Sequence, residues 1–420
     1  MAKKKLNPKD IVCLGHLKRV FTLLDQLREV GCERDKAQNR ELYFDQYCKL
    51  VLLHVWNPIL GSIADLQQAA GLKSVSRALG IKRFSAGSFS ESVRVFKPEL
   101  LRPIIEELAG QLPNQPLDPR LAEFKQALTI VDGTILAALT KLTKSALSSD
   151  GSGLPANRYN TDKNGKGMYA HRLHMQLDLE KFTPHRMDRT GARNAGENRE
   201  SNVLRRTVES GRCYVNDGGF NDRSLFDQIT EAASSFVTRM ADNSVVENPV
   251  QRPLTPADIA ANVLSDCLVQ LPDAKHPLRR IEVKVQPHPR RTRQGKKIVD
   301  RLILATNLMD LPAELISVIY NYRYTVEFYF RILKQLLGLR HLISEREEGI
   351  DIQINCTVIV CILIQLISGK KPNKAMRNMV YWYLLGLASE REVVKFLNKP
   401  DNTGVKKRAE EALFKKSDRL

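Results

Sequence analysis

Ala127-Leu-Thr-Ile-Val-Asp-Gly-Thr134 and Arg212-Cys-Tyr-Val-Asn-Asp-Gly-Gly219 are the two stretches that decide the fold. Each begins as a short, mostly apolar run, typical of a strand buried in a sheet. Each run ends on an aspartate followed by glycine, Asp132 in the first and Asp217 in the second. Side chains at strand ends often carry function, because the sheet holds them rigidly while leaving them exposed. An Asp-Gly pair is also a common turn, so either aspartate alone has a structural interpretation.

Further strands and helices surround these two stretches, and their mixture predicts an α/β catalytic region. Alternation of apolar and polar residues predicts a half-buried strand from Arg172 to Leu179. Helices are expected over 198–209 and 222–232, and a polar stretch over 185–202. Short apolar runs predict three more strands, at Ser235–Arg239, Ile281–Val285 and Leu302–Thr306.

The first hundred residues have a different texture and predict a helical region. Apolar residues recur at helical spacing between residues 8 and 110. Within it, 63–81 predicts two short helices joined at Gly71, an arrangement compatible with a helix-turn-helix whose Lys73, Ser76 and Arg77 face DNA. Plain packing of two helices is the alternative. Three prolines between Gln111 and Arg120 predict the end of this region.

The charge of the chain points to a polyanionic partner. Its 65 basic residues exceed its 47 acidic residues by 18, which favours nucleic acid or an anionic membrane. The most apolar run, 354–368, is short for a membrane span and contains Asn355 and Gln365, so it predicts a buried helix and leaves DNA as the better partner. The seven cysteines form no Cys-x-x-Cys pair, which argues against a zinc site or a disulfide framework and suits a reducing cytoplasm.

A long helical pattern from Leu311 to Leu337 carries the third acidic candidate. On one continuous helix, its residues Tyr320, Arg323, Glu327 and Lys334 would share a stripe about 60° wide. The bland interpretation is a solvated face with an ordinary Arg–Glu pair. However, a carboxylate flanked by cations and a phenol also suits metal-assisted phosphoryl transfer, since such groups bind phosphates.

The pattern Tyr-x2-Arg-x3-Glu-x6-Lys resembles the signature of bacterial insertion-sequence transposases of the DDE class, in the "insertion sequence four" group. The resemblance runs from about residue 85 to 370 and is supported by the context of Asp132 and Asp217. It implies a ribonuclease H-like catalytic core of the α/β class with an inserted β-rich domain, for which the long gap between Asp217 and Glu327 leaves room. A helical N-terminal domain would precede this core, and a helical C-terminal region would follow it.

Carried over position by position, the resemblance implies the domain layout and the site. The helical N-terminal domain, implied to bind the DNA ends, is residues 1–118; the catalytic core is 119–240 and 301–345; the insertion is 241–300; the C-terminal region with its basic tail is 346–420. Asp132, Asp217 and Glu327 match the catalytic metal ligands, for two Mg²⁺ or Mn²⁺ ions.

The expected DNA contacts come from two places. Tyr320, Arg323 and Lys334 match residues that hold phosphates at the element's end, and Tyr324 is a candidate to stack on a base. The insertion adds a basic cluster whose members are Arg290, Arg291, Arg293, Lys296 and Lys297. Gly218 departs from the arginine that many relatives carry there, and the only tryptophans are Trp56 and Trp382, so the hairpin pathway is left open.

The implied function is that of a DNA transposase in the bacterial cytoplasm. It would bind the terminal inverted repeats of its element as a homodimer on double-stranded DNA, hydrolyse phosphodiester bonds at the ends, and join the 3′-hydroxyls to target DNA. Two alternatives stay open: a catalytically idle DNA-binding regulator, and a metal-dependent nuclease without strand transfer.

Overall fold

The structure is a computed structural model that describes residues 15–30, 32, 34–36, 40–57, 60–81, 83–137, 170–191, 195–285, 300–339, 341–344, 346–384 and 387–399. It divides into two compact units. We call them the helical unit, formed by Met1–Pro113, Ile135–His171 and Tyr329–Lys399, and the sheet unit, formed by Asn114–Thr134, Arg172–Phe328 and Pro400–Leu420. The predicted basic cluster of the insertion, from Arg290 to Lys297, lies outside the described residues.

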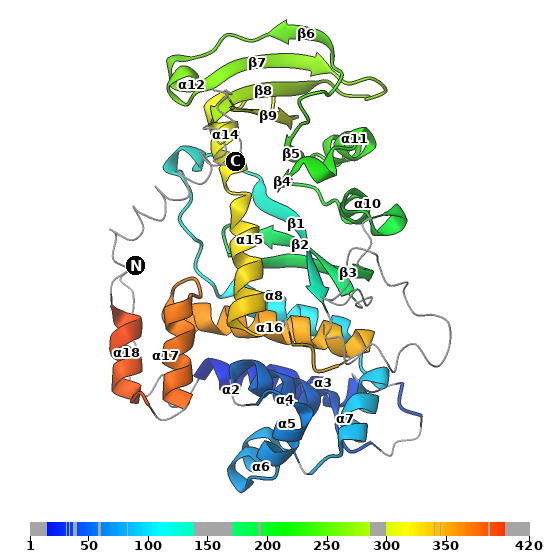
Figure 1. Cartoon of the computed structure of the whole chain (residues 1–420), viewed down its shortest axis with the longest axis vertical. Helices are drawn as coiled ribbons and strands as arrows, with labels where there is room; N and C mark the ends of the chain where they lie inside the picture. The colour runs from blue at the N-terminus through cyan, green and yellow to red at the C-terminus, as the bar shows by residue number, and fades with distance from the viewer. Residues whose placement is uncertain are drawn as a thin grey trace, which may run out of the picture. The chain divides into compact units, whose positions relative to one another are not determined.

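A nine-stranded sheet organises the sheet unit, in the order β3-β2-β1-β4-β5-β9-β8-β7-β6 (Figure 1). Strand β4 pairs in parallel with both β1 and β5, whereas β5, β9, β8, β7 and β6 pair antiparallel in succession. The strands are β1 (Ala127–Ala137), β2 (Ala170–Asp178), β3 (Thr183–Gly191), β4 (Arg212–Asn216), β5 (Ser235–Arg239), β6 (Glu247–Gln251), β7 (Val263–Gln270), β8 (Leu278–Val285) and β9 (Asp300–Thr306).

Short helices connect these strands and cover their apolar side chains. They are α10 (Glu200–Arg205), α11 (Arg223–Glu231), α12 (Pro256–Ala260) and α14 (Ala313–Asn321), and α15 (Tyr324–Arg331) runs into the helical unit. The core between α11 and the sheet contains Phe226 and Phe236, whose rings stack with centroids 4.3 Å apart. Burial of such aromatic rings contributes the largest share of hydrophobic stabilisation per residue.

The six predicted strands are present, but β7 and the two edge strands of the sheet, β3 and β6, were not predicted. Strand β3 lies in a segment predicted as a polar stretch, and only its first two residues are buried. All five residues of β6 are exposed, and Pro249 lies within it. Edge strands need not bury alternate side chains and tolerate charges and proline, so the hydrophobic pattern is weak there. Strand β1 also continues past Asp132, which the sequence placed at the strand end.

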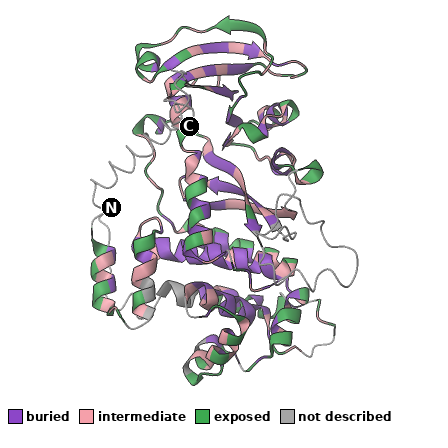
Figure 2. Cartoon of the chain, in the orientation of Figure 1, coloured by how far each residue is buried: buried purple, intermediate pink, exposed green. Residues whose placement is uncertain are grey.

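The helical unit is built around α16 (Glu347–Ser368), which packs against α4 (Phe44–Trp56) and α8 (Arg102–Gly110). By length and composition α16 could cross a membrane, but 78% of its most apolar window is buried inside the protein (Figure 2), as in a core helix. The predicted buried helix is therefore confirmed. The other described helices of the unit are α2 (Gly15–Asp25), α3 (Leu27–Val30), α5 (Ile63–Ala70), α6 (Lys73–Leu79), α7 (Ala86–Ser92), α17 (Lys374–Leu384) and α18 (Glu390–Asn398).

The pair α5 and α6 confirms two short helices joined at Gly71. Lys73 and Arg77 are exposed and lie one turn apart on α6, as DNA contacts would require. The hydroxyl of Ser76 instead donates to the carbonyl of Ile81 at 2.6 Å, so its proton is used within the fold. Recognition of DNA by this helix pair stays a prediction.

One buried ion pair fastens the antiparallel part of the sheet. Arg279 on β8 is 1% exposed, and its Nη2 lies 2.6 Å from Oδ2 of Asp266 on β7. The same guanidinium donates to the backbone carbonyls of Leu308 and Leu311, both of which precede α14. The arginine is thus hydrogen-bonded to β7 and to the segment after β9 together.

Removing one partner of this pair should destabilise the protein strongly. We expect Asp266→Asn to lower the free energy of unfolding by about 3–5 kcal/mol, because the Arg279 charge is then left buried and uncompensated. Urea denaturation measures this difference. Arg223→Gln is the control, since the Arg223–Asp273 pair is exposed and should contribute no more than about 1 kcal/mol. Equal losses in the two variants would contradict the prediction.

Candidate active site

The sheet brings Asp132 and Asp217 to equivalent positions on neighbouring strands. Ile130 of β1 is in register with Val215 of β4, and the two strands run parallel. Asp132 and Asp217 lie two residues further on, so both belong to the same face of the sheet. Strand β4 has ended at Asn216, and Asp217 caps a short 3-10 turn over Gly218–Phe220 by accepting from the Gly219 amide at 2.9 Å.

Asp132 lies in a buried, negatively charged environment. Burial raises its pKa to about 7, and the carboxylates of Asp217 and Glu200 act in the same direction. A hydrogen bond from the Gly133 amide to Oδ1 of Asp132, at 2.8 Å, and the positive charge of Arg323 oppose that rise. Several acidic groups thus share a site with little compensating charge, an arrangement that favours a bound cation.

The third carboxylate, Glu327, is paired with the arginine of its own helix. Its Oε1 lies 3.2 Å from Nη1 of Arg323, and its side chain is 48% exposed. The Arg323 guanidinium also stacks over the ring of Tyr324, 4.3 Å from its centroid. Tyr320 is 4% exposed, and burial raises the pKa of its phenol to about 12. The guanidinium of Arg323 thus interacts electrostatically with both Glu327 and Asp132.

The predicted stripe on one continuous helix is wrong in its geometry. Helix α14 ends at Asn321, and α15 begins at Tyr324 after two turn residues. In the turn, backbone amides bond three residues back, as in Arg323 to Tyr320 at 2.9 Å, so the chain is wound more tightly than an α-helix. After α15 the chain forms a π-helix over Ile332–Leu336, which is wound more loosely.

Lys334 accordingly departs from the other three signature residues. It lies in the π-helix and belongs to the helical unit, where its ammonium donates to the carbonyl of Ile135 at 2.6 Å. Tyr320, Arg323 and Glu327 all belong to the sheet unit. A contact of Lys334 with DNA stays a prediction.

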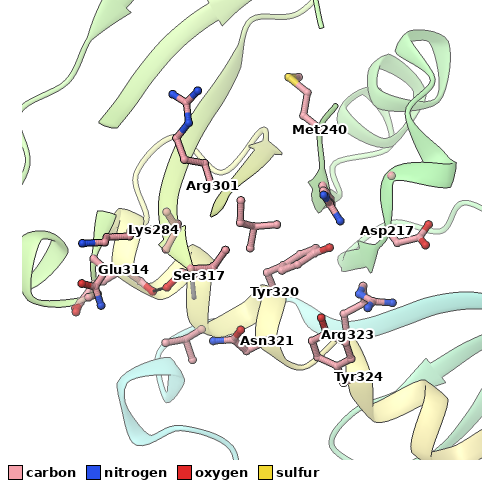
Figure 3. A pocket seen from close by; sticks show the side chains of 18 of the residues that line it. Asp217, Met240, Lys284, Arg301, Glu314, Ser317, Tyr320, Asn321, Arg323 and Tyr324 are labelled. Carbon is pink, nitrogen blue, oxygen red and sulfur yellow. Dashed lines mark hydrogen bonds between the residues drawn. The ribbon is translucent and has the colours of Figure 1, made fainter. Parts of the chain in front are cut away.

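Five of the seven predicted site residues that the structure describes line a cavity of about 1160 Å³ in the sheet unit (Figure 3). Its wall includes Asp217, Tyr320, Arg323, Tyr324 and Glu327, contributed by the end of β4 and by α14 and α15. Asp132 does not line it. The cavity also has four cationic side chains that the sequence did not single out: Arg120, Arg239, Lys284 and Arg301.

Arg239 is the cation of this group that stands beside the aspartates. Asn216 of β4 is in register with Thr238 of β5, so Asp217 and Arg239 follow at the same edge of the sheet. The hydroxyl of Thr238 donates to the Asp217 carbonyl at 3.0 Å, which fixes this junction. Arg239 is exposed, and among the described residues no ion pair joins it to a carboxylate. Arg301, by contrast, is 3.3 Å from Glu282.

Glu200 is the residue that sequence reasoning missed. It opens α10, is only 8% exposed, and pairs with Arg172 at 2.5 Å. Burial raises the pKa of its carboxyl. It lies within a polar segment with no motif or periodicity, so no sequence signal marked its burial beside Asp132.

The described residues contain no group of three His, Cys, Asp or Glu side chains that is close enough together to hold a metal ion. The predicted trio is therefore brought together only in part. Asp132 and Asp217 are neighbours, and Glu327 lies on the wall of the cavity that Asp217 also lines, but bound to Arg323. The six cysteines in the described part of the chain are buried free thiols, as predicted.

The raised pKa of Asp132 has a measurable consequence for stability. Between about pH 4 and about pH 7 the folded protein retains a proton that the unfolded chain releases, so the free energy of unfolding falls as pH rises through this window. We expect Asp132→Asn to lack this fall, and so to gain stability relative to wild type between pH 4 and pH 8 in a metal chelator. Urea denaturation at the two pH values tests it; an unchanged difference would contradict it.

Comparison with known proteins gives two matches. The family described as transposase DDE domain matches residues 123–363. A relative from Sinorhizobium fredii (strain NBRC 101917 / NGR234), named "Putative transposase y4zB", is 27% identical over 201 residues, which are 46% of this chain and 52% of the relative. The aligned part thus spans about half the length of that relative.

The family match includes β1, which carries Asp132, and β4 with the residue Asp217 that follows it, and it includes the turn and helix that carry Arg323 and Glu327. Of the residues that line the cavity, the match covers all except Arg120. Because the match extends over more than half of the 420 residues, the protein belongs to the transposase DDE domain family.

Proposed function

We propose that the protein is a DNA transposase that hydrolyses phosphodiester bonds at the ends of its element and joins the 3′-hydroxyls to target DNA. The observation that carries the proposal is the register of β1 and β4, which sets Asp132 beside Asp217, and Asp217 lines a cavity that also has cationic side chains. Within the family, we propose that the chain belongs to the "insertion sequence four" group with the Tyr-Arg-Glu-Lys signature.

The residues present fit a divalent metal by their chemistry. Asp132 and Asp217 offer hard carboxylate oxygens, which Mg²⁺ and Mn²⁺ prefer. Burial and the neighbouring carboxylates raise the pKa of Asp132 despite the positive charge of Arg323, so a bound cation would stabilise its charged form. Glu327 would complete the set by exchanging Arg323 for the metal. When bound, two such ions stabilise the attacking and leaving oxygens of an in-line displacement.

The cationic wall of the cavity suits a DNA strand. Arg323 and Tyr324 are stacked on one another and would present a flat guanidinium edge to phosphate oxygens. Arg239, which forms no ion pair with a carboxylate among the described residues, adds a guanidinium beside Asp217. Tyr320 stands on the same wall, and Lys334 and the basic cluster 290–297 would reach DNA elsewhere.

The finer architecture is part of the proposal. The parallel strands β1, β4 and β5 would form the ribonuclease H-like core, and 241–300 the β-rich insertion, which supplies β6, β7 and β8. The helices before residue 118 would bind the terminal inverted repeats. Two copies would bring two ends together in the bacterial cytoplasm.

Cleavage of DNA that contains the element's ends tests the enzyme directly. With Mg²⁺, we expect Asp217→Asn and Glu327→Gln each to lower the rate of strand cleavage more than about 100-fold while DNA binding is retained, because a lost ligand costs more than a lost supporting residue. Asp273→Asn, at an exposed carboxylate that does not line the cavity, is the control.

The products separate the alternatives. Nicked ends together with joined strands support a transposase. Nicks without joined strands would indicate a nuclease, and binding with neither product would indicate a catalytically idle regulator.

Arg239 provides a test of the DNA path. Arg239→Gln should weaken binding to all DNA sequences alike and reduce the slope of log affinity against log salt by about 1, as expected for one lost phosphate contact. Fluorescence anisotropy at several salt concentrations measures this slope. Arg223→Gln, an exposed arginine outside the cavity, is the matched control, and equal slopes in the two variants would exclude a contact by Arg239.

A further inference from the structure

The Arg172–Glu200 ion pair lies beside the backbone that follows Asp132 on β1 and Asp217 after β4. Both partners are largely withdrawn from solvent, with side chains 15% and 10% exposed, and their Nη1 and Oε1 atoms are 2.5 Å apart. The Nε of Arg172 is buried and has no hydrogen-bond partner among the residues that the structure describes. A buried pair that is incompletely satisfied gains little stability over apolar residues of the same size. Its position therefore needs another explanation.

The carboxylate of Glu200 lies next to two glycines. A Cβ atom on Gly133 would overlap Oε1 of Glu200, so only glycine fits there with Glu200 in place. A Cβ atom on Gly219 would lie 3.5 Å from Oε2 of the same carboxylate, in ordinary contact. The two oxygens of Glu200 thus lie toward Gly133 on β1 and toward Gly219 in the turn after β4.

These are the same glycines whose amides orient the two aspartates. The Gly133 amide donates to Oδ1 of Asp132 at 2.8 Å, and the Gly219 amide donates to Oδ1 of Asp217 at 2.9 Å. A displacement of Glu200 would therefore reach each aspartate through a single glycine. Groups that hold the donors of ligands in this way affect metal affinity without touching the metal.

We propose that Glu200, held by Arg172, is a positioning residue that sets the separation of Asp132 and Asp217 by packing against Gly133 and Gly219. This inference rests on the proposed metal-dependent function. The positioning depends on the shape of the Glu200 side chain and on its bond to Arg172. An isosteric replacement of Glu200 should therefore retain the positioning, and a truncation should remove it.

The test is the affinity of the full chain for Mn²⁺ without DNA, measured by titration calorimetry, with thermal melting followed separately. We expect Glu200→Ala to weaken Mn²⁺ binding about tenfold and Glu200→Gln to stay within a few-fold of wild type. Gly133→Ala should weaken binding as Glu200→Ala does, since its new methyl displaces the carboxylate. The double variant with Gly133→Ala and Glu200→Ala should lose no more Mn²⁺ affinity than the weaker-binding single variant, because both substitutions act through one contact.

Matched variants distinguish positioning from loss of stability. Glu209→Ala removes another glutamate of the sheet unit that is paired with an arginine, Arg212, and should leave Mn²⁺ affinity unchanged. A lower melting temperature with wild-type Mn²⁺ affinity in Glu200→Ala would overturn the proposal, as would Glu200→Gln binding as weakly as Glu200→Ala. If Asp132→Asn and Asp217→Asn bind Mn²⁺ like wild type, the proposed function itself fails.

Discussion

The parallel pairing of β1 with β4 is the constraint on which the site depends. A shift of one residue in that register would send Asp132 and Asp217 to opposite faces, since side chains alternate along a strand. The register is protected by what lies on either side of it: Tyr214 and Phe236 are buried in the core beneath α11, and β5 continues the sheet beyond β4. The pairing of β4 with β5 places Arg239 beside Asp217, so β4 positions both the cation and the carboxylates through its two ladders of backbone hydrogen bonds.

Most strands in the interior of the sheet could be predicted from the sequence, whereas the strands at its two edges could not. Strands buried on both faces, such as β4 and β5, are continuous apolar runs, and their predicted ends agree with the structure. The edge strands β3 and β6 carry no such pattern, because solvent covers much of their surface. The break between α14 and α15 was also missed. Its turn residues, Tyr322 and Arg323, are acceptable in a helix, and tertiary contacts such as the bond from the Asp118 amide to the Tyr322 hydroxyl decide the local geometry.

The site shows the same division between what motifs record and what packing decides. Residue spacing indicated Asp132, Asp217 and Glu327 because it recurs in a known signature, and the structure adds that Glu327 is engaged by Arg323. Glu200 and Arg172 carry no signature, since their pairing depends on where α10 and β2 meet in space. Lys334 shows the converse. It matches the signature in sequence, but a π-helix and a bond to Ile135 give it surroundings that spacing cannot anticipate.

The junction of β5 with β9 has a mechanical consequence. Asn307 accepts from the Phe236 amide and donates to the Ser234 carbonyl, and the Thr306 hydroxyl donates to the Phe236 carbonyl. These hydrogen bonds join the antiparallel strands β9 to β6 directly to β5, the strand that ends at Arg239, and no linker separates them from it. A ligand that exerts force on β8 must therefore distort the hydrogen bonds between β5 and the end of β9 before it can displace those strands. The distortion would occur at β5, the strand next to β4, which leads to Asp217.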